Sequence, residues 1–235
     1  MARAIPWLLL VAQLGTEPAS GVRPGDAVRG LWAYTALQPR DQEEFPLTGL
    51  FLFQDGFFVQ QAVNDGEPFA EQGGQAHFGT YQSQGQELRL KAETAISTSP
   101  AKEPRLSLRQ DTEHRLRPER AGDGLTLRFG SGTVQKLRRL SATKCQVYRL
   151  DRGVLALVDG HFLLVARTDG GVVAGSGTYA SRGLSLELRA TRWFAGSAER
   201  ILNRRDLTLN ATWDGQSLDL EEGLRFRVRE PASQR

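Results

Sequence analysis

Apolar and polar residues alternate along most of this chain. Leu88-Arg-Leu-Lys-Ala-Glu93 and Leu184-Ser-Leu-Glu-Leu-Arg-Ala190 place an apolar residue at nearly every second position. A β-strand points successive side chains to opposite faces, so this alternation predicts strands with one buried and one solvated face. Four further segments follow the same rule, namely 105–109, 125–129, 206–210 and 224–228. Because no stretch keeps the spacing of an amphipathic helix, the pattern predicts an all-β protein.

Two apolar runs interrupt this alternation, and each ends at an Asp-Gly pair. Leu50 to Phe53 leads to Asp55-Gly56, and Val154 to Val158 leads to Asp159-Gly160. Asp-Gly between two strand-like runs is a strong hairpin signal, because both residues tolerate the left-handed backbone of a tight turn. We therefore expect a hairpin at each pair.

The chain also resembles itself. GTYQSQG begins at Gly79 and GTYASRG begins at Gly177, with five of seven positions identical. The two Asp-Gly blocks precede these motifs in the same order, at a spacing six residues shorter in the second copy. Residues 64–75 hold the extra length of the first copy, and we align 106–108 with 207–209 further on. Matches in one order predict a tandem repeat.

The strands divide into two predicted domains, residues 28–140 and 144–230. We expect about eight strands in the first domain and about seven in the second. Eight antiparallel strands can close into a barrel that is filled by side chains or holds one small ligand, and closure removes exposed edges. The predicted fold is all-β with two tandem antiparallel barrels. One large fused barrel of about fifteen strands is the alternative.

Four motifs follow one another in the first domain: Gly30-Leu-Trp32, Phe53 to Gly56, Gly79-Thr-Tyr81 and Gly124-Leu-Thr-Leu127. In their order and spacing they resemble the short lipocalin-like domain family of bacteria and fungi. The resemblance implies a lipocalin-like barrel with an apolar interior, in a family that includes presumed binders as well as cyclases or isomerases. The second domain keeps the Asp-Gly and Gly-Thr-Tyr motifs and lacks a Gly-x-Trp start.

The N-terminus has the layout of a secretory signal peptide, which we assign to residues 1–21. Arg3 gives a positive start, residues 4–15 are mainly apolar, and residues 16–21 are small or polar. The apolar run is shorter than the ~20 residues that a bilayer-spanning helix needs. We therefore expect a secreted or periplasmic protein with no integral membrane span.

Charge and cysteine content limit the partners. The chain has 30 Lys and Arg residues against 27 Asp and Glu residues, a net charge of only +3. The arginine-rich stretches lack interleaved aromatic residues, so we predict no nucleic-acid binding. Cys145 is the one cysteine, which excludes an internal disulfide. We expect a buried thiol there, with a homodimer linked through Cys145 as the alternative.

Three histidines, His77, His114 and His161, are the candidate acid–base residues. His77 shares strand parity with Tyr81, which permits a His–Tyr pair inside one barrel. His114 stands among charged residues and is interpreted as part of a solvated strand face. No two histidines have metal-ligand spacing, and no nucleophile or phosphate-binding motif is present. We therefore predict no catalytic residue, no metal and no cofactor, while an enzymatic activity is left open.

The aromatic residues concentrate in the first domain, where pockets for small ligands are typically apolar with a few polar groups. The predicted ligand-binding residues are Trp32, Tyr34, Phe53, Phe58, His77 and Tyr81. We expect an exported lipocalin-like protein that binds a small hydrophobic molecule in a barrel cavity. Two alternatives remain, a cofactor-free isomerase or cyclase acting on a hydrophobic substrate, and a structural or interaction module with packed barrels.

Overall fold

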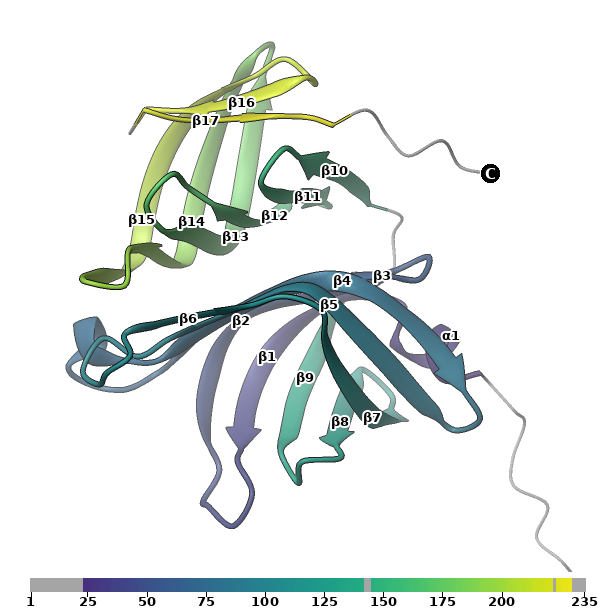
Figure 1. Ribbon diagram of the computed structural model, residues 1–235. Coiled ribbons are helices and arrows are strands. Elements are labelled where there is room, and N and C mark those ends of the chain that lie inside the picture. The colour runs from purple at the N-terminus through teal and green to yellow at the C-terminus, as the bar shows by residue number, and fades with distance from the viewer. Residues whose placement is uncertain (1–22, 142–144, 222, 230–235) are drawn as a thin grey trace, which may run out of the picture.

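The computed structural model describes residues 23–141, 145–221 and 223–229, and it shows two antiparallel β-barrels, one packed on the other (Figure 1). The predicted all-β fold with two tandem barrels is confirmed, and the alternative of one large fused barrel is wrong, because the strands form two separate sheets. The predicted signal peptide, residues 1–21, lies outside the described residues.

The first barrel is an up-and-down meander. Its strands are β1 (Gly30–Gln38), β2 (Phe45–Gln54), β3 (Phe57–Asn64), β4 (Gly74–Gln84), β5 (Glu87–Thr98), β6 (Leu106–Arg109), β7 (Thr112–Ala121), β8 (Gly124–Phe129) and β9 (Val134–Ser141). Pairing of β1 with β9 and of β4 with β5 closes the barrel, while β6 extends the sheet beside β5. A short helix, α1 (Pro24–Val28), precedes β1, and the 3-10 turn η1 (Phe69–Glu71) lies between β3 and β4.

The second barrel is also a meander. Its strands are β10 (Gln146–Leu150), β11 (Gly153–Val158), β12 (His161–Arg167), β13 (Val172–Arg182), β14 (Ser185–Gly196), β15 (Ile201–Trp213), β16 (Ser217–Leu220) and β17 (Leu224–Arg227). Its two ends meet over a short stretch, where Leu150 bridges Val228 and the Asp151 amide donates to the Arg227 carbonyl at 2.7 Å. The second barrel is therefore nearly closed.

The two Asp-Gly pairs form turns of the same geometry. In Asp55-Gly56 the φ angles are +47° and +79°, and in Asp159-Gly160 they are +44° and +73°. Such angles define the tight hairpin turn that the sequence predicts. In each barrel the turn carbonyl accepts a bond from the Gly-Thr-Tyr strand, since the Tyr81 amide bonds Gly56 and the Tyr179 amide bonds Gly160, both at 2.7 Å.

Strand pairing corrects one of the sequence alignments. Leu106 pairs with the last residue of β5, whereas the residue that pairs with the last residue of β14 is Ile201, not Leu207. Leucines that alternate along a strand match at several registers, which explains the error. The better marker is an aspartate with a left-handed backbone that stands five residues later in both barrels, Asp111 (φ +51°) and Asp206 (φ +54°).

The apolar runs are buried on both faces, which explains why they do not alternate. In β2, Phe51 and Phe53 point into the first barrel, whereas Leu50 and Leu52 point outward and pack against the second barrel. Strand β11 divides its residues in the same way between its own interior and the interface. The part of the chain that the structure describes thus has three apolar clusters, one inside each barrel and one between the barrels.

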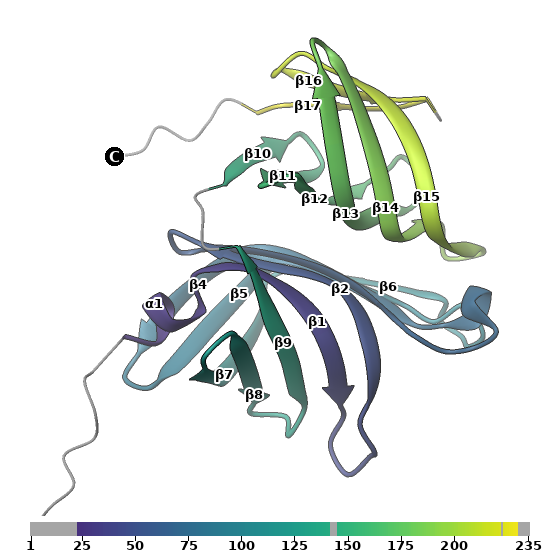
Figure 2. The same ribbon diagram turned by 180° about the vertical axis from the view of Figure 1, so that it is seen from behind.

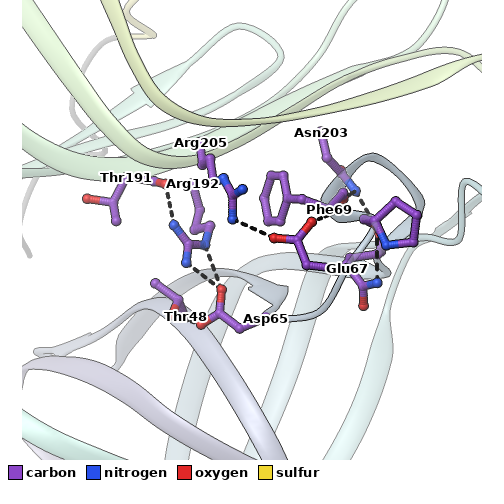
Figure 3. Close-up of polar contacts among 10 residues, drawn as sticks. Thr48, Asp65, Glu67, Phe69, Thr191, Arg192, Asn203 and Arg205 are labelled. Atoms are coloured by element: carbon purple, nitrogen blue, oxygen red, sulfur yellow. Dashed lines mark hydrogen bonds and ion pairs between the residues drawn. The ribbon is translucent and has the colours of Figure 1, made fainter.

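The loop between β3 and β4, where the sequence predicts the extra residues of a first repeat copy, docks on the second barrel (Figure 3). Phe69 of this loop is buried between the guanidinium groups of Arg192 and Arg205, at 5.4 and 5.3 Å from its ring centroid. Asp65 pairs with Arg192, and Glu67 pairs with Arg205 at 3.0 Å. The insertion therefore joins the barrels.

Candidate functional site

The six predicted ligand-binding residues belong to the first barrel, and three of them are packing residues. Trp32, Phe53 and Phe58 have no exposed surface. The Trp32 indole N–H donates to the Val28 carbonyl at 2.6 Å, and Phe53 stacks on Phe51 with ring centroids 4.1 Å apart. These three side chains fill the barrel, as close packing of interiors requires, and only Phe58 also reaches a cavity wall.

Tyr81 and His77 share the barrel interior, as their parity predicts, but they do not form a pair. Tyr81 packs edge-on against Phe53 at 5.4 Å and lies at the end covered by α1, where it lines a surface hollow with Arg29 and Asp55. His77 lies toward the other end, near the start of β4. The two side chains line different cavities.

The end of the first barrel opposite α1 holds the candidate site, on the side of the loops that join β1 to β2 and β8 to β9 (Figure 2). A cavity of about 150 Å³ opens there. It is lined by Phe58, Gln60, Gln75, His77, Leu90, His114, Phe129, Ser131, Thr133 and Gln135. None of these ten side chains is a carboxylate, lysine or arginine, so the cavity is polar without being charged.

A relay of hydrogen bonds holds the His77 ring in one tautomer. The buried Tyr34 hydroxyl donates to Gln60 Oε1 and also lies 3.3 Å from Gln135 Oε1. Gln60 Nε2 lies 2.9 Å from His77 Nδ1. An amide nitrogen can only donate, so Nδ1 accepts and the imidazole proton lies on Nε2. Burial raises the pKa of Tyr34, which keeps its hydroxyl proton in the relay.

Burial, together with the nearby His114, lowers the pKa of His77 from its ordinary 6.5 to about 4, and the Ile96 backbone opposes this shift only in part. The His77 and His114 rings lie parallel, with centroids 6.1 Å apart. Desolvation lowers the pKa of His114 as well. Both rings are therefore neutral at pH 7.

Three side-chain nitrogens around this cavity lack a hydrogen-bond partner among the described residues: Nε2 of Gln75, Nε2 of His77 and Nε2 of His114. Buried polar groups are nearly always paired, because an unpaired one loses its bonds to water without replacement. Three such atoms in one cavity indicate a place where a guest molecule can supply the missing partners.

Most of the ten residues that line this cavity were not predicted from the sequence. His114 was interpreted as solvated, yet it faces inward beside Phe129. Its parity with the buried Leu116 is the signal that identifies its face. Gln60 had no such signal, because Gln60 and Gln61 are consecutive and both are buried on opposite faces of β3. Gln61 accepts a bond from Ser176 of the second barrel at 2.6 Å.

The second barrel is filled at the corresponding place. His77 pairs with Ala95 across β4 and β5, whereas Gly175 pairs with Trp193 across β13 and β14. A Cβ atom on Gly175 would lie only 2.1 Å from the Trp193 ring. The indole thus takes the space that a larger side chain on β13 would need, and it is 2% exposed. This exchange of large and small residues favours the first barrel as the binding unit.

A hollow of about 750 Å³ lies between the barrels and carries several arginines. Arg149 donates to both carboxylate oxygens of Glu93 at 2.8 Å, and Arg152 pairs with Asp169. Arg229 donates to the Asp151 carbonyl at 2.6 Å. Because three of its arginines already hold partners, this hollow is a weaker candidate than the barrel cavity.

Cys145 is buried in the cluster between the barrels. Burial raises the pKa of its thiol to about 12, so little thiolate exists at neutral pH. Its backbone amide donates to Gln54 Oε1 at 2.8 Å. This position argues against the alternative of a homodimer linked through Cys145, since the interface between the barrels would have to open.

Among the described residues, no helix is long and apolar enough to cross a membrane. Comparisons with protein-family models, with curated proteins and with solved structures found no match to this chain.

Proposed function

We propose that this chain is a binding protein that takes a small molecule into the open end of its first barrel. The observation that carries the proposal is the group of three unpartnered nitrogens, on Gln75, His77 and His114, around one cavity. The apolar part of the wall, from Phe58, Leu90 and Phe129, supplies contact area for an apolar body. Such a mixture is typical of small-molecule sites.

The size of the cavity limits the part of the ligand that is enclosed. A cavity of about 150 Å³ is below the usual range for a drug-sized ligand, but an apolar cavity of similar volume accepts benzene. The enclosed part is therefore about one aromatic ring, or the end of a longer hydrophobic molecule whose remainder lies outside the barrel.

The sequence motifs and the architecture of the barrels support the proposal of a binding protein. The ordered motifs of residues 28–140 resemble the short lipocalin-like family, and an eight-stranded meander is an architecture that can hold one small ligand. The matching turns of the two barrels support an origin by tandem duplication, after which one copy kept a cavity.

We further propose export to the periplasm or the cell exterior, because residues 1–21 have the sequence layout of a secretory signal peptide.

The test uses a variant in which the first barrel carries the residues that fill the second barrel. In His77→Gly/Ala95→Trp the first barrel receives the glycine and tryptophan of the second barrel at the paired positions. Ligand-observed NMR with a panel of single-ring compounds, and native mass spectrometry of freshly purified protein, should show saturable binding to the wild-type chain. The variant should lose it while keeping its circular dichroism. A wild-type chain that binds none of the panel contradicts the proposal.

An isomerase or cyclase that uses the same cavity is a second candidate, favoured by the neutral His77 and the Tyr34 hydroxyl behind it. It is distinguished by turnover, since an enzyme converts a bound hydrophobic substrate and a binder returns it unchanged. For the second barrel we propose a structural role, because Trp193 fills it.

A further inference from the structure

We infer that the ligand of the first barrel is a neutral molecule that presents a carbonyl-type acceptor oxygen to His77 Nε2 and Gln75 Nε2. This inference rests on the proposed function and specifies the chemistry of the same cavity. It excludes both a bare hydrocarbon and a carboxylate as the preferred enclosed group.

The direction of the hydrogen bonds gives the first step. Tyr34 donates to Gln60 Oε1, which fixes the Gln60 amide with its nitrogen toward His77 Nδ1. His77 then has its proton on Nε2, which is buried and makes no hydrogen bond of good geometry to the described residues, although the Ile96 backbone also interacts with the ring. Gln75 Nε2 is a donor by its chemistry and is likewise unpartnered. Two donors at one cavity call for an acceptor on the ligand.

The charge of the wall gives the second step. The lining contains no arginine, lysine or carboxylate, and the lowered pKa values of both histidines keep their rings neutral at pH 7. A carboxylate in this cavity would be a desolvated charge without a counter-ion, which is costly. A ketone, aldehyde, amide or quinone oxygen accepts the same hydrogen bonds without that cost.

Tyr34 is a positioning residue in this scheme, because it acts on the ligand only through Gln60 and His77. Tyr34→Phe removes the proton that orients the Gln60 amide, so His77 loses its preference for the tautomer with the proton on Nε2. The matched control is Tyr179→Phe, which removes a phenol hydroxyl from the second barrel, away from the cavity.

The experiment measures dissociation constants for three single-ring probes of similar shape: acetophenone, its hydrocarbon isostere α-methylstyrene, and benzoate. In the wild-type chain and in Tyr179→Phe, acetophenone should bind about tenfold more tightly than α-methylstyrene, and benzoate should bind most weakly. In Tyr34→Phe the preference for acetophenone over α-methylstyrene should fall several-fold.

Each other outcome is informative. Equal binding of acetophenone and α-methylstyrene overturns the acceptor inference and leaves the proposed binding function standing. Tightest binding of benzoate overturns the inference of a neutral ligand. Absence of binding by all three overturns the inference together with the proposed function. If Tyr34→Phe does not fold, long-range proton–nitrogen NMR of the wild-type histidines decides, because a His77 proton on Nδ1 contradicts the relay.

Discussion

At the scale of single residues, the main finding is a histidine kept neutral inside a barrel. His77 receives a bond from Gln60 on one nitrogen and has its other nitrogen buried at the cavity. Desolvation is the largest cause of its lowered pKa, and the neighbouring His114 adds to the shift. Because protonation would bury a charge, the state of this ring links the cavity to the stability of the barrel.

The stability of the protein should therefore depend on pH through His77. The folded pKa of about 4 lies below the ordinary 6.5, so between these values the unfolded chain binds a proton that the folded chain does not. Stability is then complete above pH 6.5 and falls as the pH decreases toward 4, by at most about 3 kcal/mol for this group.

Urea unfolding of the wild-type chain and of His77→Gln, at several pH values from 7.5 to 4.5, measures this effect. The difference in unfolding free energy between the two proteins should change as the pH passes below about 6.5. A constant difference over the whole range contradicts the pKa assigned to His77.

At the scale of elements, strands and turns follow from the sequence more closely than the site does. Alternation and Asp-Gly pairs predict β2, β3, β5 and their counterparts, because one-sided burial and left-handed turns leave direct marks on the residue pattern. Alternation fails where both faces are buried. In β3 it cannot assign Gln60 to the cavity and Gln61 to the interface, since that depends on a second barrel which the local pattern does not contain.

The aromatic residues predicted to bind a ligand show the same limit of sequence-based prediction. Trp32 and Phe53 were expected at a ligand and are core residues, because an inward aromatic side chain in a small barrel is usually needed to fill it. A core residue and a ligand-binding residue are told apart only by the atoms that each side chain contacts in the folded protein. His77 lines the cavity together with three glutamines, which carry no recognisable motif.

The loop between β3 and β4 gives the prediction at this scale. Phe69→Ala should lower the free energy of unfolding by roughly 2 to 4 kcal/mol, because it removes a buried ring that packs between two arginines of the second barrel. It should also accelerate protease cleavage within this loop. Leu108→Ala is the control, since Leu108 is 38% exposed and should change stability by less than about 0.5 kcal/mol.

At the scale of the whole molecule, the two barrels share one interface cluster. The outward residues of β2 and β3 pack on those of β11 and β12, with Phe194 of β14 in the same cluster. Arg149 stacks on Phe57 at 4.4 Å and binds Glu93, so charged residues of both barrels border the apolar contact. Neither barrel presents a fully polar exterior when taken alone.

We therefore expect the barrels to unfold together. Differential scanning calorimetry of the intact chain should give a single transition with equal calorimetric and van't Hoff enthalpies. A chain that stops after Ser141 should bind a hydrophobic dye and aggregate, because the outer face of β2 and β3 is left uncovered. Two separate transitions, or a soluble monomer that binds no dye, would show that the barrels are independent.

The shared interface has a consequence for biosynthesis. The first barrel can complete its hydrogen bonds once β9 has left the ribosome, but the partner surface for its outer face is still to be made. At translation rates of about 5–20 residues per second, the remaining strands take roughly 5 to 20 seconds to appear. During that interval the nascent chain displays Leu50, Leu52 and Val63 to the solvent. Chaperone capture at this stage would protect the chain, and moving the second barrel to the front would shift the vulnerable period to the other half of the molecule.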